Sequence, residues 1–265
     1  MMKPWNFCME IIPSSSGRWI DGKGERTMLR EGRRVMVFSA HAADFCSRAG
    51  GTIARLVDLG GEVLVYDMTY GERCESPGIY ARSEPPPLDE IKKIRWREMQ
   101  GAAGTLGAEI RCFDFGDSPL IFDTDRRLQI TDAVRSFKPD LVLTHWHNDV
   151  LHPDHVETTK AVIWACRYCD APGVKTDHNW CEEPDIVCYE ATLGTAPVTR
   201  YLPDLYVDIT SVYERKMEAL RHLASQSQLP GNYAVLARYR GLEAKTTANM
   251  KTCIYAEGFC RMVGQ

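Results

Sequence analysis

The sequence predicts an α/β fold, a Rossmann-like, mostly parallel sheet with helices on both faces. Short apolar runs typical of buried strands alternate with longer amphipathic stretches typical of helices along most of the chain. This alternation favours a parallel sheet that is covered on both sides. Polar residues with catalytic or metal-binding chemistry directly follow several of the apolar runs. Ligands of open α/β sheets bind at that place, outside the carboxyl ends of the strands.

The elements are predicted in chain order from these patterns. Residues 1–32 are polar, glycine-rich and aperiodic, and we interpret them as an N-terminal arm before a single catalytic domain, residues 33–265. The apolar run 35–38 predicts the first strand, and a helical pattern follows it. Later strands are predicted at 62–69, 108–113, 141–144, 186–189, 205–207 and near 253–255. Helices are predicted at 88–106, 125–137, 155–169, 211–226 and about 232–248, with loops at 77–87 and 170–185.

Composition excludes several classes of protein. The 32 basic and 36 acidic side chains give a net charge of −4, so a nucleic-acid partner is not expected. No apolar run is long enough to cross a membrane, and the N-terminus lacks the apolar stretch of a signal peptide. The ten cysteines are scattered, which favours reduced thiols in a cytoplasmic protein. The CxxC pair Cys166 and Cys169 lies in a predicted helix, and we interpret both as core thiols.

The loop after the first strand carries an imidazole and a carboxylate, His41 and Asp44, three residues apart. Histidine and aspartate are two of the residue types that hold a catalytic Zn²⁺. Such a site needs three protein ligands and leaves a fourth position for water or substrate. A third ligand is therefore expected elsewhere in the chain.

The second chemistry-bearing stretch supplies that ligand. Four of the seven histidines lie between His145 and His155, again after a predicted strand. We expect His155, at the start of the next helix, to complete a one-zinc site with His41 and Asp44. His152 and Asp154 are then candidate acid/base groups or partners of a ligating imidazole. Alternation along the strand exit leaves open which of His145 and His147 faces the site.

These motifs together resemble the PIG-L/LmbE family of zinc-dependent N-acetyl-sugar deacetylases over roughly residues 34–260. The family's first motif is HPDD, whose histidine and second aspartate bind zinc together with the last histidine of a later HPDH. The resemblance places those ligands at His41, Asp44 and His155. The family's general base is the first aspartate of HPDD, and Ala43 occupies that position here.

One branch of the family, the 4-oxalomesaconate hydratases of aromatic-acid degradation, resembles this chain in the same position. That branch carries the motif SAHxADF, and residues 39–45 here read SAHAADF. Further similarity to the branch lies at residues 71–76, 115–117, 208–212 and 255–258. The second motif, HPDH, is closer to the deacetylases.

The resemblance and the residues together predict a metal-dependent hydratase that adds water to an unsaturated oxo-polycarboxylate such as 4-oxalomesaconate. Zinc would polarise an oxygen or activate water, and a nearby acid would protonate carbon. The predicted catalytic groups are His152, Glu72 and Asp154, the last orienting a histidine. The predicted substrate contacts are Arg73, Arg48, Glu75 and His145, because arginine binds carboxylates in a bidentate way.

Two alternatives stay open. A zinc-dependent deacetylase could have replaced its aspartate base with Glu72 or His152. A metal-bound binding module without turnover is the third possibility. The expected partner is a small carboxylate substrate. Binding to nucleic acid or to a membrane is not expected, and association into a homo-oligomer is left open.

Overall fold

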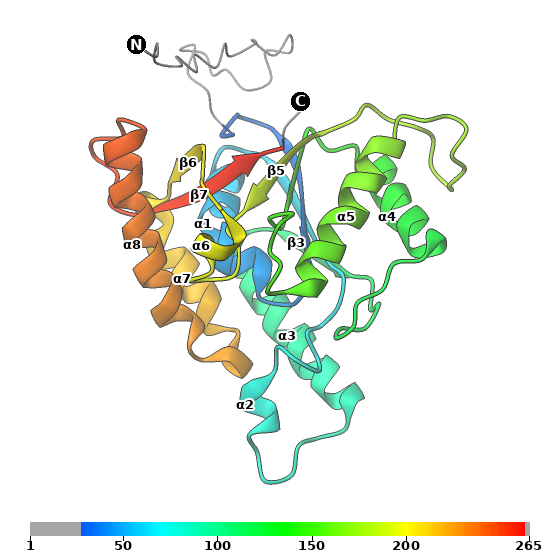
Figure 1. Ribbon diagram of the computed structural model, residues 1–265, viewed down its shortest axis with the longest axis horizontal. Coiled ribbons are helices and arrows are strands. Elements are labelled where there is room, and N and C mark those ends of the chain that lie inside the picture. Colours follow the sequence, from blue (N-terminus) through cyan, green and yellow to red (C-terminus); the bar gives the residue numbers. More distant parts are fainter. Residues whose placement is uncertain (1–27, 263–265) are drawn as a thin grey trace, which may run out of the picture.

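The computed structural model describes residues 28–262 and contains one seven-stranded sheet in the order β3-β2-β1-β4-β5-β7-β6 (Figure 1). The five strands from β3 to β5 run parallel, and β7 pairs antiparallel with both β5 and β6. The strands are β1 (Arg34–Ser39), β2 (Glu62–Asp67), β3 (Glu109–Cys112), β4 (Leu141–Thr144), β5 (Asp185–Tyr189), β6 (Leu205–Asp208) and β7 (Ala256–Arg261). The predicted fold class, a mostly parallel α/β sheet, is therefore confirmed.

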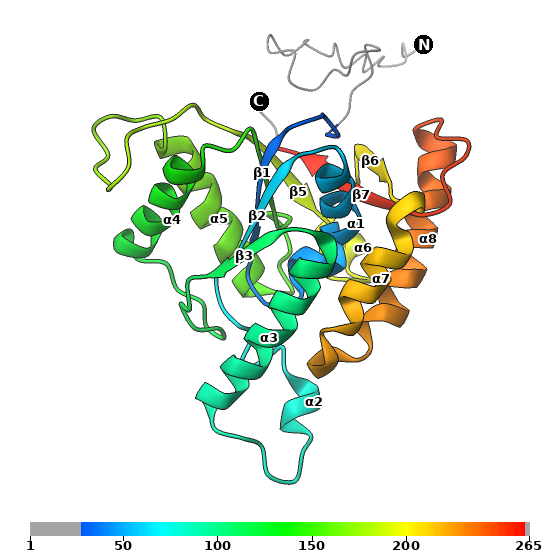
Figure 2. The same cartoon turned by 180° about the vertical axis from the view of Figure 1, so that it is seen from behind.

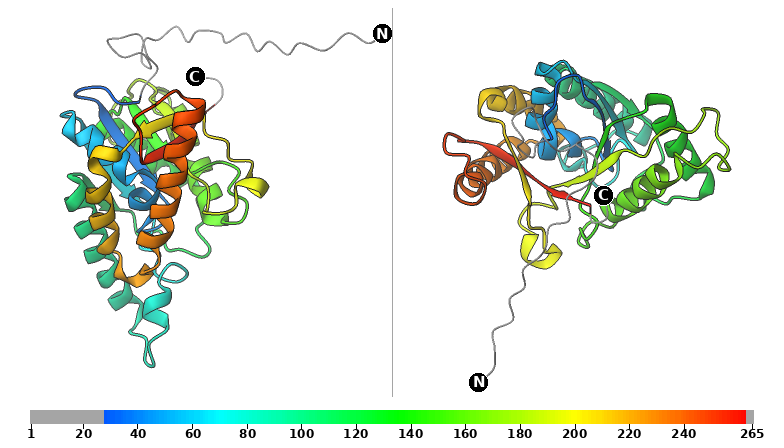
Figure 3. Two further views of the ribbon diagram at one scale, coloured as in Figure 1. Left: turned by 90° about the vertical axis from the view of Figure 1, so that its left-hand side faces the viewer. Right: turned by 90° about the horizontal axis from the view of Figure 1, so that it is seen from above.

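Helices cover both faces of the sheet. Helices α4 and α5 lie on one side, and α1, α3, α7 and α8 lie on the other (Figures 1 and 2). The view from above in Figure 3 shows the sheet between these two layers. The helices are α1 (Asp44–Asp58), α2 (Pro77–Tyr80), α3 (Leu88–Leu106), α4 (Thr124–Phe137), α5 (Pro153–Tyr168), α6 (Ala196–Thr199), α7 (Tyr213–Arg221) and α8 (Leu229–Thr247). No helix of the described part of the chain is long and apolar enough to cross a membrane.

The central strand shows why its apolar run is continuous. Val35 and Val37 of β1 pack into the core under α1 and α3, whereas Met36 and Phe38 pack into the core under α4 and α5. Successive side chains of a strand point to opposite faces, so a strand buried on both faces needs apolar residues at every position. This explains why the sequence pattern of the parallel strands is easy to detect.

The last strand is predicted too early in the chain. Residues 253–255 are not part of a strand, and β7 begins directly after them at Ala256. Glu257 and Gly258 of β7 interrupt the run of apolar residues by which a buried strand is predicted. The Glu257 carboxylate is nevertheless buried, because it binds Lys216 Nζ at 2.6 Å and accepts hydrogen bonds from the backbone amides of Gly51 and Thr52.

Other boundaries differ in smaller ways. The predicted loop 77–87 contains the short helix α2, which follows the carboxyl end of β2 and lies at the bottom of Figures 1 and 2. The predicted helix 211–226 is α7 with a 3₁₀ turn at each end. Of the predicted arm 1–32, residues 1–27 lie outside the described residues.

Gly51 allows α1 to pack closely against Ile209, which directly follows β6. A Cβ atom at Gly51 would lie 2.6 Å from Cγ2 of Ile209, closer than real side chains approach.

The chain reverses direction across the sheet at β1. It passes from β1 to β2 and β3 on one side, and then crosses to β4 on the other side. Such a reversal opens a crevice at the carboxyl ends of the two strands concerned. The loops that follow β1 and β4 carry both histidine motifs. The fold therefore brings the two motifs together at the expected place.

Candidate metal centre

The carboxylate of Asp44 lies at the middle of the centre. Asp44 begins α1, and its Oδ2 accepts a hydrogen bond from the backbone amide of His41 at 2.8 Å. The same oxygen lies 3.4 Å from Nδ1 of His41 and 3.6 Å from Nε2 of His155. All three side chains are at most 7% exposed. Residues 111 positions apart therefore converge on one oxygen.

Two imidazole nitrogens of the centre are free to bind a metal ion. Nδ1 of His41 and Nε2 of His155 are buried and have no hydrogen-bond partner among residues 28–262. Their opposite nitrogens are held by carboxylates: Nε2 of His41 lies 3.2 Å from Asp154, and Nδ1 of His155 lies 2.8 Å from Asp149. Metal-binding histidines generally have such a partner on the other ring nitrogen. The donor set therefore fits a divalent metal ion.

The electrostatics of the centre agree with this fit. Burial alone would raise the pKa of Asp44, but the positive charge of Arg48 holds it well below its usual range. Burial lowers the pKa of His155. Burial also lowers the pKa of His41, but the neighbouring carboxylates of Asp154 and Asp44 outweigh this and raise it. An ionised carboxylate and a neutral imidazole are the forms that bind metal ions, and a metal would displace the proton from His41.

Several groupings of side chains bring ligand atoms within 4.8 Å of one another. They are His41 with His152 and His155, Asp44 with His145 and His155, and His41 with Cys74 and Asp154. All of them share His41 or His155. The described residues thus contain a possible His/Asp metal-binding group at the predicted place.

Of the two ambiguous histidines, His145 faces the centre. Its ring is fully buried and stacks on His155 with centroids 3.9 Å apart, and its Nε2 accepts a hydrogen bond from the Ala40 amide. Burial lowers its pKa. His147 is exposed and packs on Trp146. Residues two apart on a strand share a face, so this difference arises because β4 ends at Thr144 and both histidines lie in the loop after it.

His152 forms a pair with Glu75 at the exposed side of the centre. Its Nε2 lies 3.0 Å from Oε1 of Glu75, and its ring stacks on His155 at 3.7 Å. Gln226 donates a hydrogen bond to the other oxygen of Glu75 at 2.5 Å. Burial raises the pKa of Glu75, but the hydrogen bond from His152 outweighs it, so the pKa is lowered. An ionised Glu75 fixes the tautomer of His152, whose Nδ1 is left unpartnered.

Asp154 links the centre to the loop that precedes α4. It accepts hydrogen bonds from the backbone amides of Ser118 and Leu120, both at 3.0 Å, in addition to its contact with His41. Burial opposes ionisation, but these hydrogen bonds lower the pKa of Asp154 to about 2. Asp154 is therefore an anion that orients His41.

Glu72 and Arg73 lie beside the centre and do not contact its histidines. Both carboxylate oxygens of Glu72 are buried without a hydrogen bond, and Lys92 and Arg73 lie 3.9 Å away. Burial raises the pKa of Glu72. The side chain of Arg73 is 48% exposed, and its backbone amide and Nη1 are hydrogen-bonded to Asp117.

Arg48 is more enclosed than a typical substrate contact. Its side chain is 7% exposed, with Nη1 2.5 Å from Oδ1 of Asp44 and Nε donating to the carbonyl oxygen of Glu190. Its polar atoms are therefore directed at the protein.

Sequence reasoning missed three supporting residues. Asp149 holds His155, Gln226 holds Glu75, and Asp117 accepts hydrogen bonds from the backbone of Arg73 and Cys74. Asp149 lies inside the histidine-rich stretch, which could have marked it. Gln226 is 151 residues from its partner, and nothing in the local pattern points to it.

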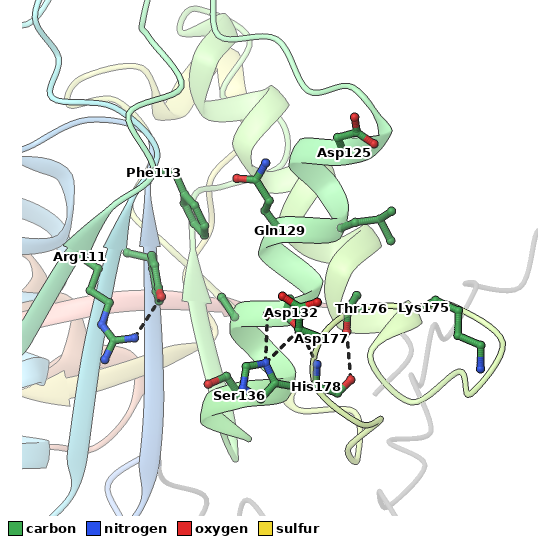
Figure 4. Close-up of a pocket in the computed structure, with 13 residues that line it drawn as sticks. Arg111, Phe113, Asp125, Gln129, Asp132, Ser136, Lys175, Thr176, Asp177 and His178 are labelled. Atoms are coloured by element: carbon green, nitrogen blue, oxygen red, sulfur yellow. Dashed lines mark hydrogen bonds and ion pairs between the residues drawn. The ribbon is translucent and has the colours of Figure 1, made fainter.

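A separate hollow of about 540 Å³ lies between β2, β3 and α4, away from the centre (Figure 4). His178, on the loop after α5, fills part of it through hydrogen bonds to Asp132. None of the centre's residues lines this hollow.

Comparison with known proteins places the chain in a family. Residues 36–166 match the PIG-L family, described as GlcNAc-PI de-N-acetylase. A 4-oxalmesaconate hydratase of Pseudomonas putida is 31% identical over 239 residues, which cover 89% of this chain and 92% of the relative. The chain therefore belongs to the PIG-L family of enzymes.

Two further comparisons describe the range of this family. The crystal structure of GalB, the 4-carboxy-2-hydroxymuconate hydratase from Pseudomonas putida, superposes with a TM-score of 0.82 and 31% identity, covering 88% of this chain and 97% of that one. The diacetylchitobiose deacetylase of Thermococcus kodakarensis is 27% identical over 75% of this chain and 71% of its own length. Hydratases and deacetylases are thus both among the relatives.

Proposed function

We propose that this protein is a metal-dependent hydratase that adds water to a C=C bond of an unsaturated oxo-polycarboxylate, such as 4-oxalomesaconate. The observation that carries the proposal is Ala43. It lies between the ligands His41 and Asp44, where the resemblance to the deacetylases requires an aspartate base, and its side chain is buried. The hydratase relative matches nearly the whole chain and so supports the same assignment.

We propose that the metal is zinc, held by His41, Asp44 and His155, because two imidazole nitrogens and one carboxylate form a common catalytic zinc set. When bound, zinc supplies a Lewis acid that polarises oxygen or lowers the pKa of water. Asp154 and Asp149 orient the two imidazoles. Arg48 holds Asp44 in place, and we therefore assign Arg48 a positioning role and not the predicted contact with substrate.

The proton in the reaction is assigned to His152. Hydration joins the hydroxyl of water to one carbon and a proton to its neighbour, so no other reactant is needed. The Glu75 carboxylate lies 3.0 Å from Nε2 of His152 and orients its ring, and we propose that His152 gives a proton to carbon. His152 is 20% exposed, so a substrate can reach it. Among the described residues no contact joins Glu72 to the centre, so we assign the proton transfer to His152.

The polycarboxylate class is supported by positive charge beside the centre. Gly71 packs on His41, because a Cβ atom at Gly71 would lie 3.2 Å from the Cβ atom of His41. Arg73 lies two residues after Gly71, and its side chain is half exposed. Arginine binds carboxylates in a bidentate way. Arg73 is therefore placed to bind one carboxylate of the substrate.

The test is spectrophotometric. Purified, metal-loaded protein is mixed with enzymatically generated 4-oxalomesaconate, and the absorbance of the conjugated system is followed with and without chelator. We expect a loss of absorbance that stops when the chelator removes the metal. Unchanged absorbance with metal bound would reject the hydratase.

A zinc-dependent deacetylase is the second candidate. The HPDH motif at residues 152–155 and the family match favour it. His152 would then be the replacement base. Release of acetate from a panel of N-acetyl sugars, in the absence of hydratase activity, would support this candidate.

The cellular setting follows from the thiols. Most of the described cysteines are buried and free, with Cys74 exposed. Free thiols persist in a reducing compartment, so we propose a cytoplasmic location.

A further inference from the structure

A hollow of about 610 Å³ lies beside the metal centre and carries two arginines. Its walls include Arg73, Phe115, Ser118 and Arg126, with Asp123 as the one carboxylate. The backbone amide of Ser118 donates to Asp154, which contacts His41. The hollow is therefore two contacts away from a predicted metal ligand.

Arg126 has no carboxylate partner among the described residues. Its guanidinium lies over the ring of Phe115, 4.8 Å from the centroid, and Nη1 donates to the carbonyl oxygen of Ile121 at 2.6 Å. The Asp123 carboxylate accepts the backbone amide of Arg126 and caps α4. The ring and the carbonyl fix the guanidinium while leaving its remaining donors for a ligand.

Arg73 faces the same hollow with a different set of contacts. Its Nη1 donates to the carbonyl oxygen of Asp117, and the Asp117 carboxylate is occupied by the backbone amides of Arg73 and Cys74. The side chain is half exposed. Carboxylate oxygens of Asp117 and Glu72 lie 3.7 Å and 3.9 Å, respectively, from Nη1 of Arg73. Of the two guanidinium groups, Arg126 is therefore the one that has no carboxylate partner among the described residues.

We propose that this hollow binds the carboxylate of the substrate that lies farthest from the reacting C=C bond, and that Arg126 determines specificity for a polycarboxylate. The inference rests on the proposed function, because it concerns the substrate of the same site. Arg73 would bind the substrate carboxylate that lies between this distant carboxylate and the reacting C=C bond. Fixed guanidinium groups are expected to favour three carboxylates over two, because each added carboxylate gains charge-assisted hydrogen bonds.

The first test measures binding without turnover. Titration calorimetry measures the binding of two ligands to the metal-loaded full chain. They are tricarballylate, an unreactive tricarboxylate, and glutarate, a dicarboxylate. We expect Arg126→Gln to weaken the binding of tricarballylate by about tenfold and the binding of glutarate by much less, because a hydrogen bond to a charged group of tricarballylate is lost. Arg126→Lys should recover part of the affinity through its charge.

Arg127→Gln is the matched control. Arg127 is the next residue of α4 and is also half-buried, but it packs over Trp164 and does not line the hollow. Equal tricarballylate affinity in the two glutamine variants, with unchanged melting temperatures, would overturn the proposal. So would an equal loss for both ligands in Arg126→Gln.

The second test separates this inference from the function itself. If the protein hydrates 4-oxalomesaconate, Arg126→Gln should raise KM about tenfold with little change in kcat, because uniform binding is lost. Selective tricarboxylate binding without any hydratase turnover would reject the function and keep the binding site. Turnover with an unchanged KM in Arg126→Gln would reject the role of Arg126 and keep the function.

Discussion

The carboxylate of Asp149 holds Nδ1 of His155 at 2.8 Å and is itself held by Thr192, whose backbone amide and hydroxyl both donate to the same oxygen at 2.9 Å. This contact leaves Nε2 of His155 facing Asp44. The orientation of the predicted ligand is therefore set by a residue six positions earlier in the chain.

We expect Asp149→Ala to weaken metal affinity by about tenfold to a hundredfold, because an unsupported imidazole is less basic and less well oriented. Competition with a fluorescent chelator measures this affinity. Asp149→Asn keeps an acceptor oxygen and should therefore lose less metal affinity than Asp149→Ala. Equal affinity in the wild type and in Asp149→Ala would show that the pair does not orient His155.

Removing a predicted ligand should abolish metal binding. We expect His41→Ala and His155→Ala to lose most of the metal, measured by elemental analysis after dialysis, because two ligands rarely retain a catalytic zinc ion. His147→Ala is the control, since His147 belongs to the same stretch but is exposed. Full metal content in either ligand variant would contradict the proposed ligand set.

The amino-acid pattern predicted the central sheet and the two histidine motifs because both are local signals. A strand such as β1 is apolar throughout, and the motif residues lie within a few positions of one another. The strand β7 is predicted a few residues too early because Glu257 and Gly258 interrupt its apolar run, and the burial of Glu257 depends on Lys216 from another element. The His152 and Glu75 pair joins residues 77 positions apart, which periodicity cannot show.

The Glu75 contact gives a kinetic prediction. We expect Glu75→Gln to lower kcat for hydration by about tenfold with a small change in KM, because an amide stabilises protonated His152 less than a carboxylate does. The readout is the split between kcat and KM. An unchanged kcat in Glu75→Gln would argue against proton transfer by His152.

Glu72 gives a prediction for stability. Its carboxylate is buried without a hydrogen bond and its pKa is raised. Such a group binds a proton more readily in the folded state, so the free energy of unfolding falls as pH rises above the ordinary glutamate pKa of about 4. We expect Glu72→Gln to match the wild type near that pH and to be about 1 kcal/mol more stable at neutral pH.

Urea unfolding at a series of pH values measures this difference. The comparison between the two proteins cancels other titrating groups. Glu90→Gln serves as the control, because Glu90 is exposed and paired with Lys93. A Glu72→Gln advantage that is constant with pH would show that Glu72 ionises normally in the folded protein.

Position 43 separates the two candidate functions. Ala43 is the N-cap of α1, a position that aspartate favours, but its side chain is buried, so the melting temperature of Ala43→Asp is measured alongside its activity. The new carboxylate would lie next to the ligand Asp44 and could act as the base that the deacetylases use. We expect Ala43→Asp to lower hydration and to create measurable acetate release from N-acetyl sugars. Ala43→Asn, which has the same shape without a base, should lower hydration and release no acetate. If both variants keep full hydratase activity and neither releases acetate, position 43 does not decide between the two reactions.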